Sequence, residues 1–174
     1  NAWIPQRELL APETKFLNPS QYTTLMLPST AEMAIVSGYY NQNNNASVGK
    51  SGRGNTRDGR VKPDIACGGI NATVLVPGGG TKVASGSSIG GAVLAGCCAL
   101  LLQWGIIDGN DPAMYSVKMK TYIIRGSEKR EGDTYPNRQW GYGMISMKGL
   151  FDNIRSRGYS EFYVGDMFVR KPNK

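Results

Sequence analysis

Ser88 is the residue whose surroundings in this sequence best suit nucleophilic chemistry. It lies in VASGSSIGGAVLAG, residues 83–96, where a glycine-rich loop leads into an apolar run. Small neighbours let backbone and substrate approach closely, and the apolar run predicts a helix that starts near Ser88. Free N–H groups at a helix N-terminus stabilise the negative charge that develops during acyl transfer. The alternative interpretation is that Ser88 simply caps the helix.

A nucleophilic serine also needs a base that accepts its proton. The chain contains no histidine, the usual base for a serine. Which group takes the proton from Ser88 is therefore an open question at this point.

Other apparent motifs offer little chemistry. Cys67, Cys97 and Cys98 show no CxxC spacing, and without histidine they cannot complete a common zinc site, so we expect small buried hydrophobes. PGGGTK, residues 77–82, lacks the Gly-Lys-Ser/Thr order of a phosphate loop. DGNDP, residues 108–112, lacks the later glutamate of a calcium loop. We expect neither a cofactor nor a metal site.

Composition indicates one globular domain. The 174 residues are 40% hydrophobic and 19% charged, which is enough for a core. The net charge of +7 is spread along the chain without an aromatic-basic module, so we expect no nucleic-acid partner. The run 89–107 has about the length of a membrane span, but Gly and Gln interrupt it, which favours a buried central helix and no membrane span. The opening NAWIPQRELL lacks a signal-peptide pattern, and we interpret the chain as a mature or proteolysed fragment.

The predicted elements mix strands and helices, which indicates an α/β class. Branched, aromatic and apolar residues predict strands over 22–27, 33–40 and 71–76, with a long polar loop over 41–64. Helices are expected over 88–105 and 147–155. A further helix runs to Gly126, with Asp111 as its N-cap and Pro112 as its first residue.

Four sequence blocks resemble motifs of the subtilisin-like serine proteases (subtilases, the peptidase S8 family), in that family's order. They are LPSTAEMAIVSGYYN (27–41), VKPDIACGG (61–69), SGSSIGGAVLAG (85–96) and WGYGMIS (140–146). The third resembles the nucleophile motif, and the attacking serine falls on Ser88. The resemblance implies an α/β fold: the C-terminal part of a subtilisin-like three-layer domain with a central, mainly parallel sheet, spanning residues 22–155.

Further stretches resemble the clostridial branch of this family, which includes the Csp proteases of spore germination. They are residues 100–126, 134–143 and 164–172. By this resemblance, the N-terminal segment 1–21 follows a jellyroll insertion. The residues EFYVGDMFVR (161–170) favour an edge strand in the tail 156–174. A bacterial location, spore-associated or secreted, is implied.

The resemblance also accounts for the missing histidine. Subtilases carry Asp, His, an oxyanion-hole Asn and Ser in that order, and only the Ser block is present here. An N-terminal fragment of the same precursor would then carry Asp, His and Asn, while this chain supplies Ser88. Met26, Leu27, Pro28 and Ser87 would border an apolar site for a protein or peptide substrate. The alternative for residues 26–28 is a buried strand end.

Several positions depart from the nucleophile pattern. Ser87 replaces Thr, Gly90 replaces Ala, Ala92 replaces Pro, and Gly68 replaces the Pro of the second block. We interpret the two added glycines as loosening the backbone, as expected in a pseudoprotease. The sequence thus predicts a serine endopeptidase of spore germination. The alternatives are a catalytically inactive pseudoprotease that acts in germination signalling, and a structural domain whose serine has no function.

Overall fold

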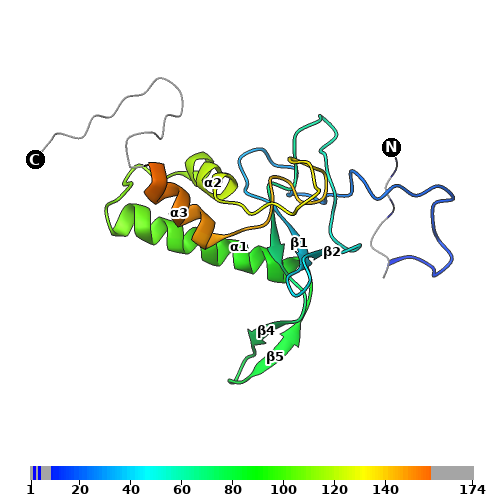
Figure 1. Ribbon diagram of the computed structural model, residues 1–174. Helices are drawn as coiled ribbons and strands as arrows, with labels where there is room; N and C mark the ends of the chain where they lie inside the picture. The colour runs from blue at the N-terminus through cyan, green and yellow to red at the C-terminus, as the bar shows by residue number, and fades with distance from the viewer. Residues whose placement is uncertain (1, 3, 5–8, 158–174) are drawn as a thin grey trace, which may run out of the picture.

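The computed structural model describes residues 2, 4 and 9–157 (Figure 1). In chain order the strands are β1 Ser37–Asn41, β2 Ala46–Ser47, β3 Ile65–Gly68, β4 Ala72–Leu75 and β5 Thr81–Ala84. The helices are α1 Ser87–Leu102, continued by the π-helical turn Gln103–Ile107, α2 Ser116–Arg125 and α3 Met147–Arg157. The expected edge strand in the tail lies outside the described residues.

β1 is the middle strand of the main sheet. It runs parallel to β3, with Ser37 opposite Ile65 and Tyr40 opposite Gly68, and β2 pairs antiparallel with its end. An isolated parallel bridge joins Ala66 of β3 to Met144. This mixture of helices with a mainly parallel sheet confirms the predicted α/β class.

The core lies where the three helices meet the sheet. In Figure 1, the N-terminal end of α1 lies at β1 and the helix runs to the left, where α2 and α3 lie above it. The indole of Trp104 packs edge-on against Tyr122 and Phe151, which ties the end of α1 to α2 and α3. The main cluster of buried side chains comprises Ile65, Cys67, Leu94, Leu101, Met114, Met119, Tyr122, Ile123, Leu150 and Ile154.

The hairpin β4–β5 extends away from this core (Figure 1). Thr73 pairs with Val83 and Leu75 with Thr81, and the side chains of Leu75 and Val83 are exposed. Asn71, at its base, donates its backbone N–H to Ser85 Oγ at 2.8 Å. The hairpin therefore ends directly before α1, the helix that begins with Ser87 and Ser88.

The predicted strand over residues 22–27 is wrong. Thr23 has a φ of 59°, in the left-handed region that interrupts an extended chain. The N–H groups of Thr23 and Thr24 donate to Gly54 O and Arg53 O, at 3.3 and 2.9 Å, and the Arg53 N–H returns to the side chain of Thr24. A turn follows over residues 27–30. The segment is thus attached to residues 53–54 but is not a strand.

The predicted start of the second helix is also wrong. α2 begins at Ser116, after an extended Tyr115, and not at Pro112. Asp111 does not cap it, because its carboxylate accepts hydrogen bonds from Lys118 Nζ and from Tyr122 OH, at 2.5 and 2.9 Å. The carboxylate oxygens of Asp111 thus bind two side chains of α2 and no backbone N–H at its start. The predicted end at Gly126 is confirmed.

α1 departs from the expected buried helix. Its buried residues, Gly90, Leu94 and Leu101, form one stripe, whereas Val93 and Leu100 are 39% and 55% exposed. Together with the π-helical turn it is long and apolar enough to cross a membrane, by length and composition only. The difference has a simple physical cause, because the described residues place the sheet, α2 and α3 along one side of the helix and nothing along the other.

Candidate active site

A glycine precedes the first residue of α1, the helix that carries Ser88. Gly86 is the N-cap of α1, with a φ of 151° and a ψ of 171°, a backbone conformation that residues with a side chain rarely adopt. Ser87 and Ser88 are therefore the first two residues of the helix, and both are exposed. No side chain caps this helix. The interpretation of Ser88 as a plain N-cap is therefore wrong.

The backbone around Ser88 offers free hydrogen-bond donors. The N–H groups of Ile89 and Gly90 both donate to Gly86 O, at 3.1 and 3.3 Å. Within the described residues, the N–H groups of Ser87 and Ser88 have no acceptor. Donors of this kind, at the positive end of a helix, are what an oxyanion requires.

The loop before α1 is hydrogen-bonded to the end of the VKPDIACGG block, residues 61–69. Gly86 donates its N–H to Gly69 O at 2.8 Å. A Cβ on Gly69 would lie 2.8 Å from Gly86 O and 3.0 Å from Tyr39 Cβ, so only glycine fits this approach. Gly69, the residue directly after β3, therefore brings the start of α1 against the sheet.

Gly90, two residues after Ser88, packs closely against β1 and β3. A Cβ there would lie 3.1 Å from Tyr39 Cβ and 3.6 Å from Cys67 Cβ. A side chain at this position would therefore fit tightly between β1 and α1, and the expectation that Gly90 loosens the backbone stays a prediction. Gly68 is similar, since a Cβ at that position would lie 3.1 Å from Gln42 Cβ.

Tyr39 and Cys67, the ionisable residues that lie next to Gly90, do not supply a base for Ser88. Burial raises the pKa of the Cys67 thiol, and the neighbouring Cys97 and Cys98 raise it further. Burial also raises the pKa of the Tyr39 hydroxyl. Both groups are therefore protonated at neutral pH. Among the described residues Ser88 Oγ has no hydrogen-bond partner, so its role as a nucleophile stays a prediction.

The expected substrate-binding residues form a separate turn. Met26 O accepts a hydrogen bond from Ser29 N at 2.8 Å, and Pro28 O accepts one from Ala31 N at 2.9 Å. Met26 and Leu27 are 64% and 84% exposed, and Pro28 is exposed as well. They are therefore not a buried strand end. Within the described residues no hydrogen bond joins this turn to Ser87 or Ser88, so the apolar pocket stays a prediction.

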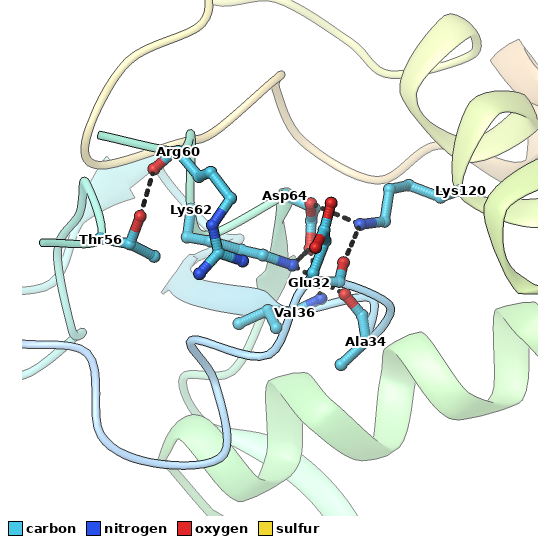
Figure 2. A network of polar contacts seen from close by, with 8 residues as sticks. All are labelled: Glu32, Ala34, Val36, Thr56, Arg60, Lys62, Asp64 and Lys120. Atoms are coloured by element: carbon cyan, nitrogen blue, oxygen red, sulfur yellow. Dashed lines mark hydrogen bonds and ion pairs between the residues drawn. The ribbon is translucent and has the colours of Figure 1, made fainter. Parts of the chain in front are cut away.

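A buried charge network supports the second block, which the sequence analysis used only as a family signature. Lys62 Nζ lies 2.6 Å from Asp64 Oδ2 and donates to Ala34 O at 2.7 Å (Figure 2). Asp64 also accepts the N–H of Val36 at 2.8 Å and pairs with Lys120 of α2 at 3.2 Å. Burial lowers the pKa of Lys62, against the attraction of Asp64. A Lys-Pro-Asp run before a buried strand is the signal that could have revealed this network.

Metal chemistry finds no support in the described part of the chain. No group of three or more Cys, Asp or Glu side chains is arranged there to hold a metal ion. Lys148 and Asp152 form an exposed pair on α3, and Asp58 pairs with Arg60 on a surface loop. The assignment of Ser88 as the nucleophile does not depend on this finding and stays a prediction.

Several solved protease structures are similar to this chain. The solved structure of the Clostridium perfringens CspB protease is 37% identical, with a TM-score of 0.82, and the match covers 88% of this chain and 33% of that one. The patellamide maturation protease PatA and the prenylagaramide maturation protease PagA, both 21% identical, match at TM-scores of 0.63 and 0.62 and share the fold. They cover 78% and 77% of this chain, and this chain spans 48% and 47% of theirs.

No curated protein matches the chain. The chain thus spans about a third of the CspB protease and about half of the two maturation proteases. A comparison with protein families matches residues 14–143 to the Subtilase family, Peptidase_S8. This match includes β1 to β5, α1 with Ser88, and α2. The chain therefore belongs to the Subtilase family.

Proposed function

We propose that this chain is the nucleophile-bearing part of a serine endopeptidase of the subtilisin type. The observation that carries the proposal is Ser88 itself, exposed at the second position of α1 beside backbone N–H groups without acceptors. A serine used only for structure would instead hydrogen-bond to the helix end or to a neighbour.

The complete enzyme requires a second polypeptide segment. An N-terminal fragment of the same precursor would supply the histidine that takes the proton, the aspartate that orients it, and an asparagine for the oxyanion hole. Two observations support this assembly. The chain has no histidine, and one face of α1 leaves apolar side chains such as Val93 and Leu100 exposed. Because the chain spans 33% of the CspB protease, a larger remainder is available to cover that face.

The reaction would proceed in two steps. Ser88 Oγ attacks a peptide carbonyl, and its proton passes to the histidine of the partner fragment. The carbonyl oxygen becomes an oxyanion, which the Ser88 N–H stabilises. As the peptide bond breaks, the amine leaves with the proton, and the acyl group stays on Ser88. Water then hydrolyses this ester and regenerates the serine.

The substrate would be a protein or peptide that binds across the start of α1. Met26, Leu27 and Pro28 would border the pocket for the residue before the scissile bond, and Ser87 would lie beside the reacting carbonyl. Their exposure supports a surface role, because side chains of a buried strand end would be shielded from solvent. Resemblance to the Csp proteases supports a bacterial, spore-associated or secreted enzyme that acts in germination.

A pseudoprotease in germination signalling is the second candidate. The observation in its favour is that Ser88 Oγ has no hydrogen-bond partner among the described residues, so no group in that part of the chain activates it. In that case the partner fragment would carry another residue where the histidine is expected.

A fluorophosphonate probe distinguishes the two candidates, because it reacts with serines that have an adjacent base. The chain is co-expressed with the segment encoded upstream of it, and the purified complex is labelled. The enzyme hypothesis expects labelling on Ser88 alone, unchanged by Ser47→Ala and abolished by Ser88→Ala. An unlabelled Ser88 in a folded complex would favour the pseudoprotease.

A further inference from the structure

The side chain of Gln42 binds the backbone of Ile70 at two points. Its amide nitrogen donates to Ile70 O, and its amide oxygen accepts the Ile70 N–H at 3.1 Å. Gln42 directly follows β1, and Ile70 is the second residue after β3, so the contact joins the ends of two parallel strands. A carboxamide that uses its donor and its acceptor on one residue does the work of a backbone peptide in a neighbouring strand.

Ile70 lies between the two residues that hold the loop before α1. Gly86 donates its N–H to Gly69 O at 2.8 Å. Asn71 donates its N–H to Ser85 Oγ, also at 2.8 Å. Beyond the contact with the glutamine side chain, the backbone of Ile70 forms no hydrogen bond within the described residues. That contact therefore fixes the chain between the two attachment points.

Ser85 and Gly86 directly precede the first residues of α1. Ser87 and Ser88 follow them, with backbone N–H groups that have no acceptor within the described residues. An error of about 1 Å in the position of a reacting group can cost about a hundredfold in rate. A contact that holds residues 69–71 in place therefore bears on the position of Ser88 and of the oxyanion donors.

The contact also depends on the glycine at position 68. A Cβ on Gly68 would lie 3.1 Å from Gln42 Cβ and 3.2 Å from Gln42 Oε1, so the Gln42 side chain would have to shift. The family pattern has a proline at this position, and its ring also begins at Cβ. Gly68 and Gln42 are thus linked, because the glycine leaves the space that the glutamine occupies.

We propose that Gln42 is a positioning residue for Ser88, which acts through Ile70 and does not contact the substrate. The inference rests on the proposed function, because it concerns the same nucleophile. Held by Gln42, the segment 69–71 keeps the loop before α1 in the arrangement in which Ser88 attacks. Loss of the contact slows this attack and leaves substrate binding nearly unchanged.

The test uses the complex in which this chain is co-expressed with the segment encoded upstream of it. Gln42→Met has a side chain of similar length without the amide atoms. We expect kcat for a peptide substrate and the rate of fluorophosphonate labelling at Ser88 to fall about tenfold, as for the loss of a hydrogen bond. KM should stay within about twofold, because the residue does not touch the substrate.

Two control variants separate positioning from general stability. Asn43→Ala removes the next exposed amide along the chain. Ser127→Ala removes a hydroxyl that binds Ile124 O and Tyr142 O, at 2.7 and 2.9 Å, so it lowers the melting midpoint without a hydrogen bond to residues 69–71. Neither control should change the labelling rate by more than about twofold.

Exchange of the Gly86 amide proton provides a readout that does not depend on activity. It should be faster in Gln42→Met than in the wild type, because its acceptor, Gly69 O, is held less firmly. Gly68→Ala displaces the Gln42 side chain, so it should have the same effects as Gln42→Met. The double variant should be no worse than Gln42→Met alone, because both changes act on one contact.

The labelling rate of a folded Gln42→Met complex decides the inference. A rate equal to that of the wild type would overturn it, as would additive effects of Gly68→Ala and Gln42→Met. A rise in KM with unchanged kcat would assign Gln42 to the substrate, which also overturns it. If Gln42→Met does not fold, the labelling rate of Gly68→Ala decides in the same way.

The wild-type complex separates this inference from the proposed function. If Ser88 is not labelled in the folded wild-type complex, the proposed function is wrong and the inference falls with it. If Ser88 is labelled in the wild type and equally fast in Gln42→Met, only the present inference fails.

Discussion

The ammonium group of Lys62 lies 2.6 Å from Asp64 Oδ2, and both side chains are at least 96% buried. The pair sits between β1 and α2, because Asp64 also accepts the N–H of Val36 and pairs with Lys120. It thereby fixes the start of β3, which leads through Cys67 to the loop before α1.

Loss of the Asp64 charge should destabilise the protein strongly. Asp64→Asn leaves Lys62 buried without its counter-charge, and such a change costs about 3–5 kcal/mol of unfolding free energy. The measurement is urea unfolding of the co-expressed complex. Asp152→Asn is the control, because it removes an exposed partner of Lys148 and should leave the midpoint almost unchanged. Equal effects of the two variants would show that the buried pair has no special role.

The chain should not form a stable domain by itself. One face of α1 and the exposed residues around Met26 leave too much apolar surface in water. Calorimetry of the isolated 174-residue chain should show no cooperative transition, while the complex with the upstream segment should melt cooperatively. A monomeric chain that melts cooperatively would contradict this expectation.

Ser88→Ala should separate activity from stability. Removal of a triad member lowers turnover by about a millionfold. The hydroxyl makes no hydrogen bond within the described residues and does not cap α1, so the melting midpoint should stay the same. Peptide cleavage and thermal melting of the complex provide the two measurements. A loss of only about tenfold would exclude Ser88 as the nucleophile.

Gly90 should be sensitive to added volume. A Cβ at this position already lies 3.1 Å from Tyr39 Cβ, and overpacking of such a contact costs about 1–3 kcal/mol. Gly90→Val should therefore lower the unfolding free energy of the complex and slow the labelling of Ser88. Gly49→Ala is a control, because a Cβ there meets nothing within 4 Å. A fully active and stable Gly90→Val variant would contradict the packing.

The Cys67 thiol should make stability fall at alkaline pH. Burial raises its pKa, so the folded state holds the proton where the unfolded state has lost it. The stabilising contribution is complete below the ordinary thiol pKa of about 8.5 and declines as the pH rises above it. Urea midpoints at pH 8 and pH 10 should differ more for the wild type than for Cys67→Ala. Cys67 should also resist alkylation in the native complex.

Local signals were sufficient for several elements. The glycine-rich approach to Ser88, the stop at Gly126 and the start of α3 at Met147 depend on residues adjacent in the chain, and each appears where it was expected within a residue or two. The family also followed from four short blocks, because each contains its own backbone-determining glycines or proline. The α/β class needed no information from outside these segments.

The features that the sequence did not predict depend on residues that are distant in the chain. Asp111 cannot cap α2, because Lys118 and Tyr122 take its carboxylate. The tight fit of Gly90 exists only because Tyr39 of β1 crosses the helix at that point. Apolar composition predicted that α1 would be buried, but burial requires an element on each side, and the described residues cover one.

The sequence by itself determined the class of the fold and the absence of a histidine, and it predicted the nucleophile, because these are properties of residue types and short spacings. Only the tertiary structure showed that Ser88 is exposed and does not cap α1, and that Arg53 is buried without an acidic partner among the described residues. The physical reason is that solvent exposure and charge pairing are set by which distant segments come together. Residue types alone do not specify which distant segments make contact.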